Sequence, residues 1–176
     1  MADKAAEVPL ASAVRVRFAT PDDAALIVKL VRELTEYQQQ PLDNVHLTEA
    51  DILRDSFGPA PRIETILAEV EGKPCGFVVF FHNYSTWAGR HGIYLLDVYV
   101  RDWARGLGVG RRLMAEMAAL ARERGSTKLD LSVLAWNPAR EFYEHLGFEA
   151  QTDWHDYRLA GSRLAKLAEE AEGVER

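Results

Sequence analysis

The sequence has 176 residues, of which 48% are hydrophobic and 27% are charged, and its formal net charge is −6. This length and composition are typical of one globular domain, and the acidic balance disfavours a nucleic-acid-binding surface. The apolar runs fall short of the roughly 20 residues that cross a bilayer, and a single cysteine, Cys75, excludes an internal disulfide framework. We therefore expect a cytoplasmic protein with neither a membrane nor a nucleic acid as its partner.

The first ten residues lack the basic start and the long apolar core of a secretory signal. No internal repeat and no long linker divides the rest of the chain. We therefore expect a flexible leader at residues 1–12, followed by a single domain at residues 13–173.

The first half of the chain is predicted to form both strands and helices. Apolar and basic residues alternate at 14–18, which indicates a strand. Thr20 and Pro21 then supply the cap and the first residue of a helix, whose apolar period ends near Tyr37. The other elements expected here are a helix from Thr48 to about Phe57, strands at 63–70 and 75–81 joined by a turn at 71–74, and a loop at 82–90.

The most hydrophobic strand, at 93–100, is followed directly by a glycine-rich turn, Arg105-Gly106-Leu107-Gly108-Val109-Gly110, and then by a helix. A nearly continuous apolar run indicates a central strand. The first N–H groups of a helix lack partners and the helix dipole favours negative charge there, so the turn predicts a phosphate or pyrophosphate site. Arg111 and Arg112 replace the residues that dinucleotide and nucleotide phosphate loops require, so neither of those loops fits.

The last third of the chain is predicted to complete a mixed sheet. A strand is expected at 128–134, and Asn137 caps a short helix that carries Tyr143 and stops at Gly147. The remaining elements expected are a β segment from Phe148, a strand at 156–159 and a peripheral helix at 162–172. This order of elements predicts a mixed α/β sheet with helices on both faces.

Two motifs resemble one family. The glycine turn is similar to the Arg/Gln-x-x-Gly-x-Gly/Ala loop of the GNAT acetyltransferases, and residues 137–148 resemble their Asn-x-x-Ala/Ser-x-x-x-Tyr-x-x-x-Gly-Phe segment. The resemblance runs from Arg17 to Leu159 and is strongest to the diamine acetyltransferase branch. It implies the GNAT acyl-CoA N-acyltransferase fold with about seven strands, and transfer of an acetyl group from acetyl-CoA to a small-molecule primary amine by direct attack.

The same resemblance implies a cofactor site. The backbone of about 98–100 pairs with the pantetheine arm, the N–H of Val98 stabilises the oxyanion, and Arg105 adds charge beside the pyrophosphate. Asn137 contacts coenzyme A, and Tyr143 matches the family tyrosine that protonates the departing thiolate, unless it is only a core aromatic. The cofactor-binding residues expected are Val98, Tyr99, Val100, Arg105, Gly106, Leu107, Gly108, Val109, Gly110, Arg111, Asn137 and Tyr143. No metal is expected, because the five histidines are scattered without ligand spacing.

Asp97 is a charged residue in an otherwise apolar strand, which is costly unless the carboxylate has a purpose. It is a catalytic candidate together with Tyr143, because the attacking amine must lose a proton to Asp97 or to a water that Asp97 holds. The alternative is a structural ion pair between Asp97 and a nearby arginine.

The polyamine enzymes attract their substrate with carboxylates, and three of these positions hold Gln38, Ser85 and Leu96 in this chain. We therefore expect a smaller amine, amino-acid-like or thialysine-like, in place of a polyamine. The substrate-binding candidates are Tyr37, Gln38, Trp87, Leu96, Asp97 and Tyr157, with Glu36 beside them. The alternatives are acetylation of a protein amine and a non-catalytic sensor of acetyl-CoA. By the resemblance, we expect a homodimer formed through the late strands and the C-terminal helix.

Overall fold

The structure is a computed structural model that describes residues 14–171 and residue 173. The expected leader at residues 1–12 lies outside the described residues. The chain divides into two compact units, one ending at Arg140 and the other beginning at Glu141. The expectation of a single domain at residues 13–173 stays a prediction.

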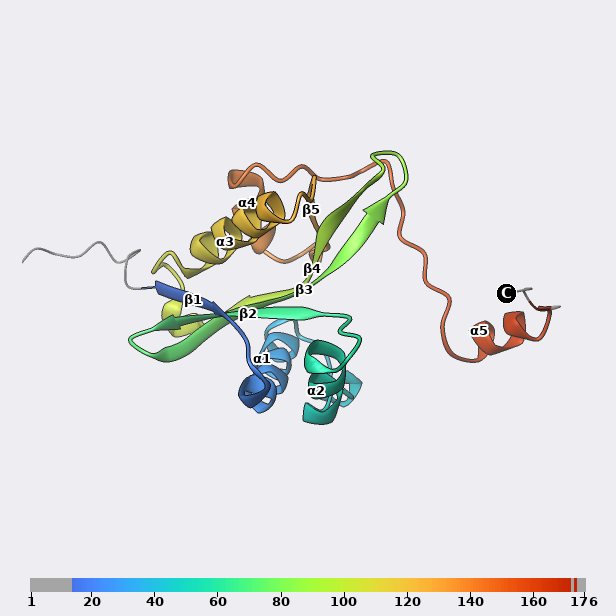
Figure 1. Ribbon diagram of the computed structural model, residues 1–176, viewed down its shortest axis with the longest axis horizontal. Helices are drawn as coiled ribbons and strands as arrows, with labels where there is room; N and C mark the ends of the chain where they lie inside the picture. Colours follow the sequence, from blue (N-terminus) through green and yellow to red (C-terminus); the bar gives the residue numbers. More distant parts are fainter. Residues whose placement is uncertain (1–13, 172, 174–176) are drawn as a thin grey trace, which may run out of the picture. The chain divides into compact units, whose positions relative to one another are not determined.

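The first unit is built on a five-stranded sheet in the order β1-β2-β3-β4-β5 (Figure 1). The strands are β1 (Val14–Phe18), β2 (Glu64–Val70), β3 (Lys73–Ser85), β4 (Arg90–Val100) and β5 (Leu129–Leu131). Neighbouring strands from β1 to β4 are antiparallel, whereas β4 and β5 are parallel. A parallel pair needs a crossover, and the helix between β4 and β5 supplies it. The mixed α/β sheet is therefore confirmed, with five strands among the described residues where about seven were expected.

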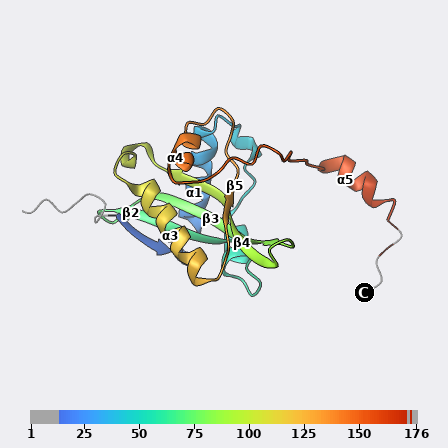
Figure 2. The ribbon, with the colours of Figure 1, turned by 90° about the horizontal axis from the view of Figure 1, so that it is seen from above.

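Helices cover both faces of this sheet, as Figures 1 and 2 show. The helices of the chain are α1 (Ala24–Tyr37), α2 (Glu49–Phe57), α3 (Val109–Glu123), α4 (Ala139–His145) and α5 (Gly161–Ala168), with short 3₁₀ turns at Pro21–Asp23 (η2), Leu42–Asn44 (η3) and Asp102–Ala104 (η4). Helices α1 and α2 lie on one face and α3 lies on the other. Thr48 caps α2 through a reciprocal pair of hydrogen bonds with Asp51, as its sequence predicts. Among the helices of residues 14–171, none has the length and apolarity that a membrane crossing requires.

The face of the sheet under α1 carries a compact hydrophobic core. Leu30 and Leu34 of α1 pack on Leu67, Phe77 and Val79 of the central strands, and all five side chains are buried. Apolar residues spaced three to four apart on α1 contact alternate residues of β3. The apolar face of the helix and one face of the strand, both expected from the sequence, therefore pack against each other. This core is the rigid support on which the side chains of the site described below rest.

Arg17 of β1 ties the start of the chain's first helix to the sheet. Its guanidinium donates to both oxygens of Asp23, at 2.7 and 2.8 Å, and to Glu69 of β2 at 2.8 Å. The hydrogen bonds from Arg17 lower the pKa of Asp23 to about 2, against the opposing effect of burial. The Asp23 carboxylate is therefore charged at neutral pH, and its pairing with Arg17 makes its burial tolerable.

β4 contains one residue more than β3 at its centre. Leu95 pairs with Phe80 and Asp97 pairs with Val79, so Leu96 has no opposite residue and forms a β-bulge. Paired residues share a face and successive residues alternate, so the bulge reverses which face the odd-numbered residues of β4 occupy. Asp97 consequently lies on the α1 face with Val79, whereas Leu95 lies on the α3 face with Phe80.

Several expected boundaries were wrong. The expected loop at 82–90 is mostly strand, because β3 runs to Ser85 and β4 begins at Arg90. The strand expected at 128–134 is reduced to Leu129–Leu131, and no strand forms at Phe148 or at 156–159 among the described residues. Alternation of apolar and polar residues predicts a strand only where a partner strand supplies hydrogen bonds, and these segments have none. The last helix, α5, is shorter than the 162–172 expected.

Candidate functional site

The glycine-rich turn lies between η4 and α3, and its backbone requires glycine at two positions. Gly106 has φ +78° and Gly108 has φ +81°, in the left-handed region that side chains disfavour. A Cβ atom on either residue would meet no atom within 4 Å, so close packing does not demand these glycines. Gly108 is the N-cap of α3. The conformation of the turn therefore explains both glycines, and it leaves their backbone bare.

The amides that begin α3 are available to an anion. The N–H of Leu107 donates to Ala104 O at 3.4 Å, and the next paired amide is that of Arg112, which donates to Gly108 O at 3.0 Å. Within the described residues, no acceptor faces the amides of residues 108–111. Four such donors at the positive end of a helix of 15 residues have the geometry that an anion site requires, and the site itself stays a prediction.

The arginines around this turn have different roles. Arg101 is committed to Glu33 of α1 through two hydrogen bonds of 2.8 Å and to Pro74 O through a third. Arg112 pairs with Glu116 one helical turn away at 2.5 Å. Arg101 thus fixes the end of β4 to α1 and β3. Arg111 is exposed and has no acidic partner among the described residues, whereas Arg105, also exposed, pairs with Asp102 at 2.8 Å and keeps only part of its donor fork for an anion.

One edge of β4 is unpaired beyond the bulge. β5 pairs with Ile93, Tyr94 and Leu95 and ends there, whereas β4 continues to Val100. On this edge, no described strand pairs with residues 96–100, although β3 pairs with residues 97–100 on the other edge. The outward N–H and C=O groups of this segment can therefore hydrogen-bond an extended ligand, as an added strand would.

Asp97 lies in this unpaired segment and is half-buried. Desolvation by burial raises the pKa of its carboxyl group above the ordinary aspartate range. Within the described residues, no cation pairs with this carboxylate and no donor hydrogen-bonds it. The alternative of a structural ion pair with an arginine is therefore wrong for this part of the chain.

Tyr37, Tyr99, Arg105 and Asn137 come together from four segments of the first unit. The rings of Tyr37 and Tyr99 lie 6.1 Å apart, and the guanidinium carbon of Arg105 lies 4.3 Å from the centre of the Tyr37 ring. The hydroxyl of Tyr37 donates to the side-chain oxygen of Asn137 at 3.4 Å. Sequence reasoning grouped Tyr37 with the substrate, and no local pattern could have indicated its contact with Arg105.

Asn137 begins α4 in the way its sequence predicts. Its side chain is buried, and its oxygen accepts from the N–H of Ala139 at 2.9 Å. The side-chain nitrogen keeps its donors for another group. Tyr143, further along α4, belongs to the second unit and is also buried, between the rings of Phe142 at 5.3 Å and Phe148 at 5.5 Å.

The other substrate candidates lie on separate elements. Trp87 is exposed at the end of the β3–β4 hairpin, roughly 20 Å along β4 from Asp97 at about 3.3 Å per residue. Gln38 follows the end of α1, and Leu96 exposes its side chain at the bulge. Tyr157 is exposed in the second unit. No cluster of three or more possible metal-ligating side chains occurs in the part of the chain that the structure describes.

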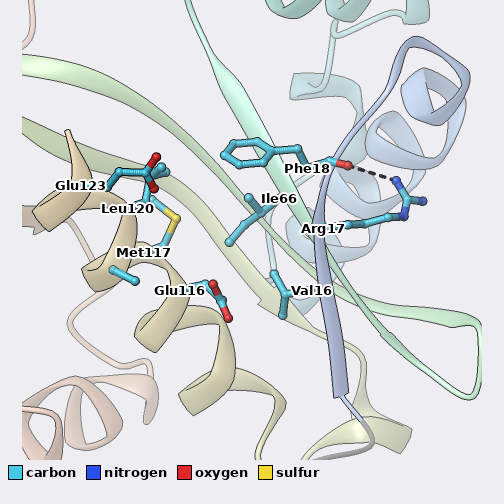
Figure 3. A pocket seen from close by; sticks show the side chains of 9 residues that line it. Val16, Arg17, Phe18, Ile66, Glu116, Met117, Leu120 and Glu123 are labelled. Atoms are coloured by element: carbon cyan, nitrogen blue, oxygen red, sulfur yellow. Dashed lines mark hydrogen bonds between the residues drawn. The ribbon is translucent and has the colours of Figure 1, made fainter.

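A shallow groove between β1 and α3 is separate from these features (Figure 3). Val16 and Phe18 line it on one side, and Met117 and Leu120 line it on the other. It follows the second half of α3, whereas the unpaired amides lie at the start of that helix. None of the residues predicted for the functional site lines this groove.

Comparison with known proteins agrees with this geometry. Residues 29–148 match the model of the Acetyltransferase (GNAT) family. A thialysine N-epsilon-acetyltransferase of Bos taurus is 35% identical, over 88% of this chain and 97% of its own. The L-ornithine N5-acetyltransferase NATA1 of Arabidopsis thaliana is 25% identical, over 87% of each chain. An integron cassette protein from the mobile metagenome of V. cholerae shares the fold, with a TM-score of 0.74 and 24% identity over 90% of this chain and 99% of its own.

With the match above, the chain belongs to the acetyltransferase (GNAT) family, and its resemblance to the diamine acetyltransferase branch is confirmed.

The Asp97 carboxylate generates a prediction about stability. Its folded-state pKa is raised, so its cost is absent below the ordinary aspartate pKa, grows as the pH rises from there to the raised pKa, and is fully present above it. We expect Asp97→Asn to raise the melting temperature at pH 7, on the order of a few degrees, and to have a smaller effect near pH 4. Thermal unfolding at both pH values measures this.

Asp130→Asn is the matched control, because Asp130 is paired with Lys128 at 2.6 Å and with Asn83 at 2.8 Å. That substitution should lower the melting temperature at pH 7. A lower melting temperature for Asp97→Asn at pH 7 would mean that the Asp97 carboxylate has a stabilising partner.

Proposed function

We propose that this protein transfers an acetyl group from acetyl-CoA to the primary amine of a small molecule by direct attack of the amine. Membership of the GNAT family supports acetyl transfer. The observation that carries the proposal is the row of unpaired amides at residues 108–111, directly after a strand with an open edge. These two features suit the pyrophosphate and the pantetheine arm of one ligand.

The backbone supplies most of the proposed contacts to acetyl-CoA. The unpaired amides of residues 108–111 hold the pyrophosphate, and Arg105 adds a positive charge. The open edge at Val98, Tyr99 and Val100 pairs with the pantetheine amides. An N–H of this edge, that of Val98, donates to the thioester oxygen as negative charge develops on it. Asn137 offers its side-chain nitrogen to the same ligand.

Two side chains move protons in the proposed reaction. The amine nitrogen must be neutral to attack, and Asp97, directly or through a water, accepts its proton; a raised pKa makes this carboxylate a better base. As the carbon–nitrogen bond forms and the carbon–sulfur bond breaks, Tyr143 donates its proton to the departing thiolate. The products are the N-acetylated amine and free coenzyme A.

The substrate we propose is an amino-acid-like amine. The two relatives described above are named for thialysine and L-ornithine, which are amino acids that carry a second amine. The polyamine carboxylates are replaced, and one replacement, Leu96, exposes an apolar side chain at the bulge beside Asp97. A substrate that carries its own carboxylate would be repelled by a row of acidic residues, so the replacement of the polyamine carboxylates supports an amino-acid-like substrate.

We also propose a homodimer in the cytoplasm. The second unit exposes several large apolar side chains, which is typical of an interaction surface: Trp154, Tyr157, Leu159, Leu164 and Leu167. A single buried cysteine suits a reducing compartment. A monomer in sedimentation equilibrium at micromolar concentration would contradict the dimer.

Gly108→Asp tests the anion site. The new carboxylate faces the pyrophosphate and strains a residue whose φ is +81°, so we expect at least tenfold weaker binding of coenzyme A by calorimetry. Gly72→Asp is the control, because Gly72 also has a positive φ and open space but lies in the β2–β3 turn. Unchanged affinity in Gly108→Asp, or no saturable binding by the wild-type protein, would exclude the proposed site.

Tyr143→Phe distinguishes a catalyst from a sensor. Loss of the proton donor should lower kcat by roughly a hundredfold or more, while the affinity for coenzyme A stays within about twofold. Steady-state release of coenzyme A and calorimetry measure the two quantities. Tyr84→Phe removes a hydroxyl from an exposed tyrosine and should change neither. An undiminished kcat in Tyr143→Phe would exclude the role of Tyr143, and no turnover by the wild-type protein would favour a sensor.

A panel of amines tests the substrate class. Thialysine and ornithine should be acetylated with a kcat/KM at least about tenfold above that of spermidine, because the carboxylates that attract a polycation are absent. Coenzyme A release measures each amine, and a lysine-containing peptide represents protein acetylation. Spermidine as the best substrate by a wide margin would refute the proposed class, and a preference for the peptide would favour protein acetylation.

A further inference from the structure

The position of Tyr37 at the end of α1 points to a role in the cofactor site. We propose that Tyr37 is a positioning residue whose ring holds the Arg105 guanidinium ready for the pyrophosphate of acetyl-CoA. This inference rests on the proposed function and deepens it, because it assigns Tyr37 to the cofactor side of the site.

The ring of Tyr37 is supported by the hydrophobic core. It packs against the cluster formed by α1, β2 and β3 and lies 6.1 Å from the ring of Tyr99. Tyr99 in turn meets the buried ring of Phe77 edge to face at 6.5 Å. A row of aromatic rings thus leads from the centre of the core to the surface at the glycine-rich turn. Its last member, Tyr37, cannot move far without disturbing packed residues.

Arg105 lies across the outer face of this ring. Its guanidinium carbon is 4.3 Å from the centre of the Tyr37 ring and 5.9 Å from that of Tyr99, within the range of cation–π attraction. Its Nε donates to Val100 O at 3.1 Å, and its Nη1 pairs with Asp102 at 2.8 Å. Val100 and Asp102 are close neighbours of Arg105 in the chain, whereas Tyr37 is a contact that ties the arginine to α1, a distant part of the chain.

The remaining nitrogen of Arg105, Nη2, has no acceptor in the part of the chain that the structure describes. Arg105 also stands three residues before Gly108, where the unpaired amides begin. A guanidinium held over a ring has fewer orientations open to its donors, so less conformational entropy is lost when an anion binds. The Asp102 carboxylate neutralises part of the Arg105 charge, and the neutral Tyr37 ring orients the guanidinium without neutralising more of it.

The hydroxyl of Tyr37 contributes less than its ring. Its contact with the Asn137 oxygen is 3.4 Å long, which is beyond the usual range for an O–H···O hydrogen bond, and that oxygen already accepts from Ala139. The proposal therefore depends on the ring face. We therefore expect phenylalanine at position 37 to preserve the function of the ring, and an aliphatic residue at this position to lose it.

The experiment compares two donors, acetyl-CoA and acetylpantetheine, which lacks the pyrophosphate. In Tyr37→Leu we expect the KM for acetyl-CoA to rise about fivefold, as expected for loss of an exposed cation–π contact, with the KM for acetylpantetheine and for the amine unchanged. Tyr37→Phe should restore the wild-type KM for acetyl-CoA to within twofold. Arg105→Ala should cost at least as much as Tyr37→Leu, and the double variant should be no worse than Arg105→Ala.

Tyr84→Leu, at an exposed tyrosine of the β3–β4 hairpin, is the matched control and should leave each KM at its wild-type value. If Tyr37→Leu does not fold, Tyr37→Met keeps an apolar, helix-compatible side chain and undergoes the same test. An unchanged KM for acetyl-CoA, an equal rise for both donors, a rise for the amine alone, or additive effects in the double variant would each overturn the proposal. Failure of the wild-type protein to bind coenzyme A at all would overturn the proposed function instead.

Discussion

The pairing of β4 with β5 ends next to the β-bulge, where β4 contains one residue more than β3. Leu96 is that extra residue, and β5 ends opposite Leu95. A bulge bends a strand and interrupts its ladder, so the segment after it can face a ligand on one edge while the other edge stays in the sheet. The bulge also turns Asp97 and Tyr99 toward the α1 face. The open edge, the half-buried carboxylate and the aromatic support of the glycine turn all follow from this one insertion.

The end of β4 must also be held still if the turn after it is to present its amides in a fixed direction. Arg101 does this by joining Glu33 of α1 and Pro74 O of β3 through three hydrogen bonds of 2.8 Å. Such a planar, bidentate contact fixes orientation as well as distance. The turn therefore begins from a point that is attached to both layers of the first unit. The N-terminus of α3 depends on this attachment for its position relative to the open edge.

The site contains two features that reduce the stability of the fold. Within the described residues, the amides of residues 108–111 have no acceptor, and the Asp97 carboxylate has no cation beside it. Elsewhere the same sheet pairs its charges, as Arg17 does with Asp23 and Glu69. Unpaired polar groups that destabilise the fold are expected in a binding site for a charged ligand, because the ligand supplies their missing partners when it binds.

The sequence by itself determined the features that depend on neighbouring residues. The cap at Thr48, the end of α1 at Tyr37, the glycine-rich turn before α3 and the family all follow from residues a few positions apart. Caps, turns and helical periods act over one or two turns of chain, so a reader of the sequence can recognise them. The two motifs likewise lie within single short segments.

Only the tertiary structure decided the register and the distant contacts. The bulge at Leu96 was hidden in an apolar run, because a continuous hydrophobic strand shows no change of period when its faces are exchanged. The strands expected after Phe148 depended on partners that alternation cannot supply. Tyr37 meets Arg105 and Asn137, which are 68 and 100 residues away in the chain, because the sheet brings the end of α1 to the start of α3 and α4. Such proximity is a property of how packed elements are ordered in space, and no local pattern of residue types encodes it.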